Sequence, residues 1–450
     1  MTEGPSAPTT SGGAGRAARQ FWWWVGAAVV AGFVLRAVWV ANAAHTPLGL
    51  YDPARYLSGG IQIARGKGYR EAFTSQPTAY YPPGYPGFVG AIIWLSLHNP
   101  FMRNAVALIG YVQALLGAAT IAAAAVIGRR VASPAAGIAA AALVALYPNL
   151  IFHTAAVLSE TLCIALLLGA LAVLWWHTDG RPPTRRQVVV FAVLFALGVM
   201  VRPISLPVLA VVILLWWREA PDRRQFLRWS AVAVGVLVVV MGSWTIRNAV
   251  RMHHFVPLST NTGDNLCIGH ARGATGGFRL VPQCNDTKGS ILDGPDGEVA
   301  HDREAREVGL RGLSRNVGRE PWLTWQRLYF MFQSDHDGLQ GSSSYGADPW
   351  LTSGPKRTLS RIGDDYGAVI VALGLIGSAL LLWRGNADGR GLVAVGVVVV
   401  GVPLLFFGDP RFKVPVTPLL AVAAAVALVA PVESLTQRVA SRGRGPAGSP

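Results

Sequence analysis

Residues 49–60, GLYDPARYLSGG, place a carboxylate directly after a long apolar run. Within this stretch Asp52 is followed by Arg55 and Tyr56. A carboxylate in such a position can act as a general base that takes a proton from an attacking hydroxyl. The alternatives are a solvated loop acid or a helix cap, which are ordinary positions for Asp. The positions of the other polar residues in the chain help to distinguish between these interpretations.

Several more charged or polar residues stand at the ends of apolar runs or just inside them. A charged group at membrane depth costs free energy, so each one is a candidate for function. Guanidinium groups also bind phosphate through paired hydrogen bonds. We expect the following residues to bind the substrate or a lipid phosphate: Arg55, Tyr56, Tyr81, Glu160, Arg202, Arg247, Asn248, Arg411 and Lys413.

Structural alternatives exist for several of these candidates. Glu160, expected about two turns inside the helix predicted at 153–176, can pair with an arginine of another helix. Arg202 and Arg247 can be boundary arginines that reach the membrane interface. Tyr81 can belong to an aromatic belt. For two further residues, His153 and Arg36, we expect structural roles.

The sequence contains no motif that requires a cofactor. It has no P-loop, and no Cys or His spacing indicates a structural zinc site. A divalent cation, Mg or Mn, stays open, and the only ligands that we would name for it are Asp52 and Glu160.

The elements that must position these residues are membrane-spanning helices. Of the 450 residues, 52% are hydrophobic and only 14% are charged, and the mean hydropathy is +0.39. Long apolar runs of this kind are typical of an all-α polytopic membrane protein. About ten runs approach the usual span of about 20 residues: 20–43, 104–127, 135–151, 153–176, 187–201, 203–217, 228–246, 366–383, 391–407 and 413–431.

The net charge of +15 comes mostly from arginines at alternate connections between these runs. This distribution indicates the side of the membrane that faces the cytoplasm and argues against nucleic-acid binding. It predicts that both termini lie inside and that Asp52 faces outside. The composition, rich in Arg, Ala, Gly and Val and poor in Lys, indicates a bacterial source, so we expect the bacterial cell membrane. The arginines expected inside are Arg16, Arg19, Arg129, Arg130, Arg181, Arg185, Arg186, Arg218, Arg223, Arg224, Arg228, Arg384, Arg390, Arg438, Arg442 and Arg444.

Two extracytoplasmic regions follow from this topology. The first, 44–103, carries Asp52 and a short apolar stretch, 84–99, that we interpret as an interfacial or re-entrant helix. The second, 247–365, lies between spans 7 and 8 and contains EPWLTWQRLYFMF (320–332), whose Trp and Tyr residues suit a helix lying on the bilayer. The remaining units are a cytoplasmic tail 1–19, a catalytic transmembrane module 20–246, C-terminal helices 366–431 and a tail 432–450.

Three cysteines are present. Cys163 lies within a predicted span and is expected to be an inert packing residue. Cys267 and Cys284 both fall in the second outer region, where an oxidising compartment permits a disulfide between them.

Several segments together resemble a known family. YDPARYLSGGIQIARGKGY, YYPPGYPGF, ALYPNLIFHTAAVLSETL, ALGVMVRPISL, WTIRNAVRMHHFVPLSTNTGDNL and GDPRFKVPVTPLL, in this order over residues 20–431, resemble the dolichyl-phosphate-mannose-protein mannosyltransferases. That family belongs to the GT-C superfamily, together with aminoarabinose–lipid A transferase. The resemblance places Asp52 where the family has its general base. Arg55 stands where a second acid is common, so metal dependence stays open.

The resemblance implies transfer of a sugar from a polyprenyl-phosphate carrier to an acceptor hydroxyl on the outer face, with inversion. Membrane lipids would surround the enzyme, and its acceptor would be a protein, a glycolipid or a polysaccharide. An oligosaccharide ligase that uses a lipid diphosphate is a variant of this activity. The alternative from another class is a transporter or flippase of lipid-linked saccharides, although the internal repeats common in transporters are not evident in the sequence.

Overall fold

The computed structural model describes residues 11–100, 102–176 and 182–443. Within these ranges the regular elements are helices, and the only pairings of extended chain are two isolated bridges, Arg70 with Pro77 and Gly277 with Gly408. Arg181, Arg444, residues 1–10 of the predicted N-terminal tail and residues 445–450 of the C-terminal tail lie outside the described residues.

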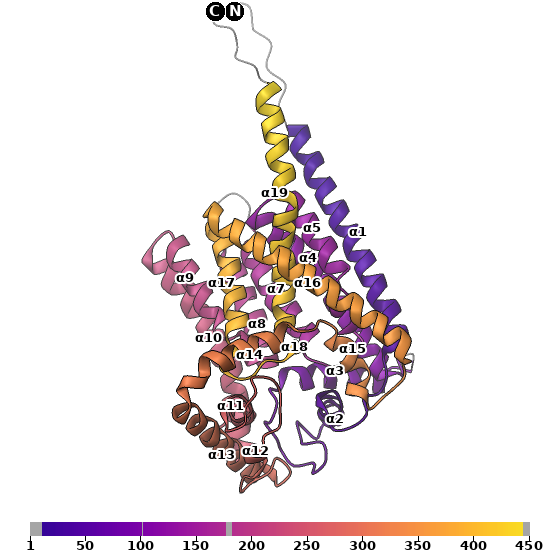
Figure 1. The fold of residues 1–450 in the computed structure, drawn as a ribbon, viewed down its shortest axis with the longest axis vertical. Helices are drawn as coiled ribbons and strands as arrows, with labels where there is room; N and C mark the ends of the chain where they lie inside the picture. The colour runs from indigo at the N-terminus through magenta and orange to yellow at the C-terminus, as the bar shows by residue number, and fades with distance from the viewer. Residues whose placement is uncertain (1–10, 101, 177–181, 444–450) are drawn as a thin grey trace, which may run out of the picture.

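A bundle of long apolar helices forms most of the molecule (Figure 1). Six helices in the described ranges are long and apolar enough to cross a membrane, and two apolar helices are shorter. The prediction of an all-α, multi-pass membrane protein is confirmed. The helices that correspond to the ten predicted runs are α1 (Ser11–Ala43), α4 (Ala105–Val131), α5 (Pro134–Ala145), α7 (Glu160–Trp175), α8 (Arg185–Val201), α9 (Val208–Glu219), α10 (Arg223–Met252), α16 (Ser353–Arg384), α17 (Ala387–Gly401) and α19 (Thr417–Gly443).

Local sequence explains where several of these helices begin. The Asn104 side chain accepts a hydrogen bond from the backbone of Ala107 and starts α4, and Thr184 and Gln187 form a capping box at the start of α8. Pro134, which suits the first turn of a helix, follows the Ser133 cap of α5. These polar residues mark the points at which one apolar helix is separated from the preceding segment of the chain.

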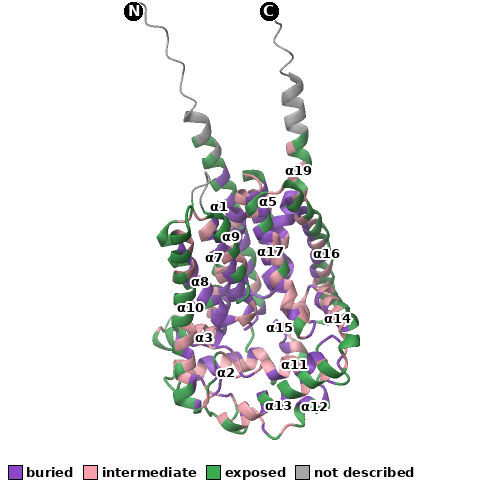
Figure 2. Cartoon of the chain, turned by 90° about the vertical axis from the view of Figure 1, so that its left-hand side faces the viewer, coloured by how far each residue is buried: buried purple, intermediate pink, exposed green. Residues whose placement is uncertain are grey.

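Small residues let the helices approach closely. A Cβ at Gly377 of α16 would overlap the carbonyl oxygen of Ala423 of α19, and one at Gly137 of α5 would lie 2.5 Å from the carbonyl oxygen of Ala125 of α4. Such contacts replace the hydrophobic effect as the main source of helix association in lipid. Figure 2 shows the buried residues gathered where helices face one another and exposed residues on the outward faces.

A second layer of helices covers one end of the bundle. The start of α1 and the end of α19 both lie at the opposite end of the bundle, which we call the terminal end (Figure 1). The end that carries the second layer is called the site end. Its helices are α2 (Asp52–Ala64), α3 (Gly84–His98), α6 (Pro148–Phe152), α11 (Thr262–His270), α12 (Pro282–Asn285), α13 (Gly294–Arg315), α14 (Glu320–Phe332), α15 (Asp337–Ser342) and α18 (Pro410–Lys413).

Two of the predicted runs are interrupted in the structure. The run 135–151 breaks between Ala145 and Pro148, and the run 153–176 becomes helical only at Glu160. Glu160 is therefore the first residue of its helix and not two turns inside it. Tertiary contacts explain the second break, because the Gln113 amide donates to the carbonyl oxygens of Thr154 and Ala156 and holds that segment as turns.

Other boundaries also differ from the sequence-based prediction. The helix α1 already includes residues 11–19 of the predicted tail, and α19 continues past Pro431 to Gly443. At the second outer region, α16 begins at Ser353, well before the predicted boundary at 366. Polar residues at helix ends do not stop a helix unless a cap or a tertiary contact replaces its hydrogen bonds.

Candidate active site

Asp52 is the first residue of α2, and its two carboxylate oxygens are both held. The Tyr81 hydroxyl donates to Oδ1 at 2.6 Å, and the Arg411 guanidinium donates to Oδ2 at 2.6 Å. The Asp52 side chain is nevertheless 30% exposed. Its orientation is thus fixed while it stays within reach of a ligand.

Glu160, the second acid of the site, is completely buried. One oxygen, Oε1, accepts from Arg411 Nε at 2.8 Å and from Arg202 at 2.6 Å. The other oxygen, Oε2, has no hydrogen-bond partner among the described residues. Arg411 therefore bridges the two acids, and two guanidinium groups balance two carboxylates. We call Asp52, Tyr81, Glu160, Arg202 and Arg411 the central cluster.

Breaks in three membrane helices bring the central cluster together. Glu160 opens α7, and Arg202 is the C-terminal cap of α8. Arg411 lies in the short helix α18, which starts because Pro410 suits a first turn and the Asp409 side chain accepts from the Arg411 backbone at 2.9 Å. The Phe412 ring lies 5.9 Å from the Arg202 guanidinium carbon.

Tyrosine rings wall the cluster on the side of α2 and α3. Tyr56 packs against Tyr81 with ring centres 4.9 Å apart and against Tyr85 at 5.0 Å. Burial and the neighbouring Asp52 carboxylate raise the pKa of Tyr81 well above its ordinary value. The Tyr81 hydroxyl therefore stays protonated and donates its hydrogen bond to Asp52.

Lys413 does not join the central cluster. Its side chain is buried, donates to the Ser334 carbonyl oxygen and lies 3.1 Å from Asp335 Oδ1. It belongs to a second buried group that the sequence did not indicate, which we call the Asp335 cluster: Tyr147, Asn149, His153, Asp335, Asp337 and Lys413.

The Asp335 cluster ties three segments together. Tyr147 donates to Asp335 at 2.6 Å, the Asn149 amide reaches both Asp335 and Asp337, and His153 bonds Asp337 at 2.8 Å. His153 thus has the buried structural contact that its sequence position suggested. The aspartates of SDHDG (334–338) were the one available signal, but a short polar stretch of this kind by itself suggests only a flexible connection.

Arg247 and Asn248 also lie apart from the central cluster. Arg247 donates to the carbonyl oxygens of Thr78 at 2.9 Å and Tyr69 at 2.6 Å, and packs over the Trp244 ring. Asn248 is buried and donates to the Val256 carbonyl oxygen. Both residues connect the end of α10 to the chain around it, a contact that local sequence does not reveal.

In the described part of the chain, Arg55 makes no hydrogen bond or ion pair with the central cluster and lies instead against the chain that leads to it. Its guanidinium is 3.5 Å from Glu71 and 5.9 Å from the Tyr80 ring. A further residue that the sequence did not single out is Tyr345, whose ring centre lies 5.4 Å from that of Tyr51, the residue before Asp52.

The acids of the site do not fit a divalent cation between them. Asp52 Oδ2 and Glu160 Oε1 both accept hydrogen bonds from the Arg411 guanidinium, which therefore lies between the two acids. Positive charge is already supplied at that position by a side chain. Among the described residues no group of three or more His, Cys, Asp or Glu side chains is arranged to hold a metal ion.

Cys267 and Cys284 form a disulfide with a Cα–Cα distance of 5.8 Å, while Cys163 is free and buried. The bridge links α11 to α12 and packs against Ala305 of α13. It stabilises the covering layer rather than the central cluster.

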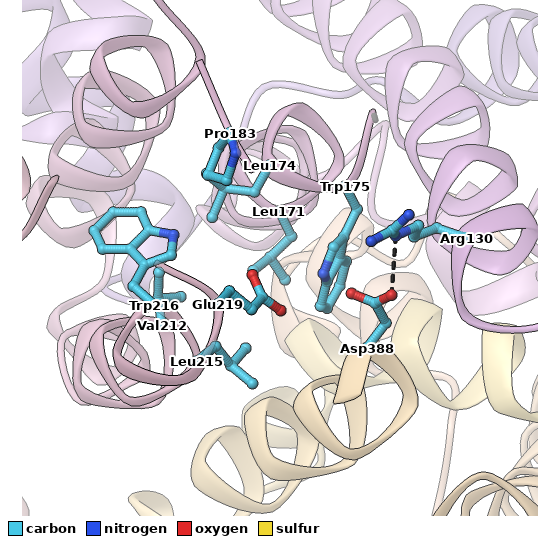
Figure 3. A pocket seen from close by; sticks show the side chains of 10 residues that line it. All are labelled: Arg130, Leu171, Leu174, Trp175, Pro183, Val212, Leu215, Trp216, Glu219 and Asp388. Carbon is cyan, nitrogen blue, oxygen red and sulfur yellow. Dashed lines mark ion pairs between the residues drawn. The ribbon is translucent and has the colours of Figure 1, made fainter. Parts of the chain in front are cut away.

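A small cavity toward the terminal end is a separate feature (Figure 3). Its volume is about 30 Å³, enough for about one water molecule. It is lined by side chains that include Trp175, Trp216 and Glu219, and by Asp388, which pairs with Arg130 at 2.9 Å. It is too small for a sugar or a lipid headgroup.

No family model matches the chain, and no curated protein matches its sequence. Solved structures do resemble its fold. The apo oligosaccharyltransferase of Archaeoglobus fulgidus has a TM-score of 0.52 at 15% identity, over 95% of this chain and 52% of that chain. The same enzyme tethered to an acceptor peptide containing the NVT sequon has a TM-score of 0.52 at 14% identity, over 92% of this chain and 50% of the other.

A third structure is ArnT from Cupriavidus metallidurans bound to undecaprenyl phosphate, with a TM-score of 0.38 at 14% identity, over 92% of this chain and 78% of that chain. The present chain spans about half the length of the archaeal oligosaccharyltransferases. The likeness to those enzymes confirms the predicted fold of GT-C type.

Proposed function

We propose that this protein is a membrane glycosyltransferase that moves a sugar from a polyprenyl-phosphate carrier to an acceptor hydroxyl. The observation that carries the proposal is the Asp52 carboxylate, which is partly exposed and oriented by Tyr81 and Arg411 at the site end of a membrane bundle. The fold shared with the Archaeoglobus oligosaccharyltransferase supports the same class of reaction.

Asp52 suits the role of the general base. An acceptor hydroxyl attacks the anomeric carbon of the donor sugar, and its proton passes to an Asp52 oxygen. The bond between the anomeric carbon and the phosphate oxygen breaks, and the phosphate leaves with the electron pair. Displacement by direct attack inverts the configuration at that carbon. Atoms and charge balance without a further reactant.

Arg202 and Arg411 are suited to stabilise the negative charge of the leaving phosphate. Both guanidinium groups are held by Glu160, so they are in place before the negative charge develops. A phosphate is a bidentate partner for a guanidinium and can replace Asp52 as the partner of Arg411. That exchange would free Asp52 Oδ2 at the moment when the donor is bound. The same arginines supply the charge that Mg²⁺ or Mn²⁺ would otherwise provide.

We infer that the site end faces the outside of a bacterial cell membrane and that both termini lie in the cytoplasm. The arginines near the terminal end support this orientation. Nucleotide sugars are not available outside the cell, so a lipid-borne donor would be needed there. The acceptor would be a protein, a glycolipid or a polysaccharide.

The test uses the protein in lipid nanodiscs with radiolabelled polyprenyl-phosphate sugars, and follows the release of free polyprenyl phosphate. We expect release by the wild type and a loss of roughly 100-fold or more in Asp52→Asn, which keeps the side-chain shape but cannot take the proton. Asp286→Asn, at an exposed position, is the matched control and should behave as the wild type.

Two results would contradict the proposal. Wild-type activity in Asp52→Asn would remove Asp52 from the reaction. Absence of release with every donor, combined with movement of lipid-linked sugar across sealed vesicles, would identify a flippase instead.

A further inference from the structure

Tyr345 carries a hydroxyl group that is buried and has no hydrogen-bond partner among the described residues. Three other tyrosine hydroxyls near the site have partners, since Tyr81 donates to Asp52, Tyr80 to Asp264 and Tyr85 to Gln113. Buried polar groups in folded proteins almost always have partners, because leaving one unpaired costs free energy. The Tyr345 hydroxyl therefore requires an explanation.

The backbone at Tyr345 is in an unusual conformation. Ser344 has φ +49° and Tyr345 has φ +53°, so two consecutive residues with side chains occupy the left-handed region. This region is unfavourable for a bulky residue, and such strain concentrates at functional sites. The turn persists because Ser344 Oγ accepts from the Leu48 backbone at 3.0 Å and Lys356 reaches Ser343 Oγ at 3.4 Å.

The strained turn packs Tyr345 against the residue that precedes Asp52 in the chain. Its ring lies 5.4 Å from that of Tyr51, the residue that precedes Asp52. Burial raises the pKa of the Tyr345 hydroxyl well above its ordinary value, and the charges of Arg411, Asp52 and Glu160 act on it. The group is therefore a protonated donor whose hydrogen bond no described residue accepts, on a ring that packs beside the residue before Asp52.

An incoming anion would satisfy this donor. Arg202 and Arg411 together already balance the charges of Asp52 and Glu160, and neither acid accepts a hydrogen bond from Tyr345. We propose that the Tyr345 hydroxyl binds a non-bridging oxygen of the donor's phosphate, next to the guanidinium of Arg411. The inference rests on the proposed function, of which it names the phosphate contact. Tyr345 is a binding residue in this arrangement, and it touches the leaving group.

The test compares Tyr345→Phe with the wild type in nanodiscs and measures the affinity for three probes: a polyprenyl phosphate, inorganic phosphate and the corresponding polyprenol. We expect Tyr345→Phe to bind polyprenyl phosphate roughly 10- to 100-fold more weakly, as for the loss of a hydrogen bond to a charged group. Polyprenol binding should not change. A parallel loss for inorganic phosphate would show that the phosphate group alone is recognised, and a loss confined to the lipid would show that the tail is also needed.

Tyr51→Phe is the matched control, because it removes a hydroxyl from the neighbouring ring and keeps the ring contact. Its affinity for polyprenyl phosphate should equal that of the wild type. The melting temperature supplies a second measurement. Removing an unpaired hydroxyl should leave the melting temperature of the ligand-free protein unchanged or slightly higher, whereas a clear decrease would show that the hydroxyl has a structural partner and would overturn the inference.

Equal affinity of Tyr345→Phe and the wild type for polyprenyl phosphate would also overturn it. The proposed function is tested separately by sugar transfer. If the wild type transfers no sugar but Tyr345→Phe still weakens binding of polyprenyl phosphate, then the phosphate contact stands and the transferase assignment fails.

Discussion

Arg411 is the residue on which the chemistry of the site depends most. It bonds Asp52 through one nitrogen and Glu160 through another, a geometry that a lysine could not reproduce with a single ammonium group. Because Glu160 is fully buried, its charge needs the two arginines that face it. The guanidinium of Arg411 thus occupies the position at which two facing acids would otherwise hold a cation.

Removal of divalent cations tests this position. We expect sugar transfer to continue at an unchanged rate in EDTA, because Arg411 supplies the charge between Asp52 and Glu160. Arg411→Ala, which removes that charge, should lower the rate roughly 100-fold or more. The measurement is the transfer rate with and without EDTA, followed by addition of Mg²⁺ or Mn²⁺. A wild-type rate that falls in EDTA and recovers with either ion would show that a metal is needed.

At the scale of elements, the covering layer holds the first outer region in place. Glu298 of α13 is buried and accepts from the Thr78 hydroxyl at 2.6 Å, the Ala79 backbone at 2.9 Å and the Thr260 hydroxyl at 2.6 Å. The segment that it holds leads directly to Tyr81. The helices α11 and α13 thereby influence the orientation of Asp52 without contacting it.

The pair of His301 in α13 and Asp264 in α11 gives this layer a dependence on pH. A hydrogen bond from His301 to Asp264, opposed by burial, raises the pKa of His301 above its ordinary value of 6.5. A histidine whose pKa is raised by folding contributes stability fully below the unfolded value. That stability is lost as the pH rises through the folded value.

We therefore expect the melting temperature of the wild type to exceed that of His301→Gln most clearly below pH 6.5, with the difference shrinking as the pH rises. The measurement is thermal unfolding of both proteins at several pH values below and above 6.5. His254→Gln is the control, since its partner Asp296 is 94% exposed and the pair should add little at any pH. A difference that grows with pH would mean that folding lowers the pKa of His301 instead of raising it.

The close contact between α16 and α19 leads to a prediction about the stability of the bundle. In Gly377→Ala the new methyl group would overlap the Ala423 carbonyl oxygen, so the helices must separate. We expect a loss of about 1–3 kcal/mol of stability, measured by thermal unfolding in detergent. Gly235→Ala in α10 is the control, because nothing lies within 4 Å of its Cβ position. There the better helix propensity of Ala should leave stability equal or about 0.5–1 kcal/mol higher. Equal effects of the two substitutions would contradict the packing argument.

For the whole molecule, the site end and the terminal end separate two environments. The central cluster, the disulfide and the covering helices share the site end, whereas α1 starts and α19 finishes at the other (Figure 1). The candidate site therefore lies at the end of the bundle opposite the start of α1 and the end of α19. That separation suits a donor that is delivered within the lipid and an acceptor that arrives from water.

The orientation can be measured with reporters in intact cells. If the proposed orientation is right, green fluorescent protein fused after residue 450 will fluoresce, because the proposal places that fusion in the cytoplasm. Alkaline phosphatase inserted at the exposed Asp286 will be active, because the proposal places the covering layer outside. The opposite pattern at both sites would invert the topology.

The helical, membrane-spanning character of the protein was predictable from its sequence, because apolar runs of sufficient length leave the backbone no alternative in lipid. The order of its motifs also indicated the fold and singled out Asp52. The apolar runs located the starts of α4, α5 and α8 to within two residues, whereas the start of α16 was 13 residues off and the breaks at 145–148 and 153–159 were missed. Those breaks depend on side chains of other helices, such as Gln113.

Only the tertiary structure decided which charges meet. Arg411 reaches Asp52 across 359 positions of sequence, whereas Lys413, two residues further along, pairs with Asp335 instead. Tyr345, with its strained backbone and unpaired hydroxyl, carried no signal in the sequence. The physical reason is that a buried charge is stabilised by whatever partner the packing of helix ends brings to it, and local spacing holds no information about that partner.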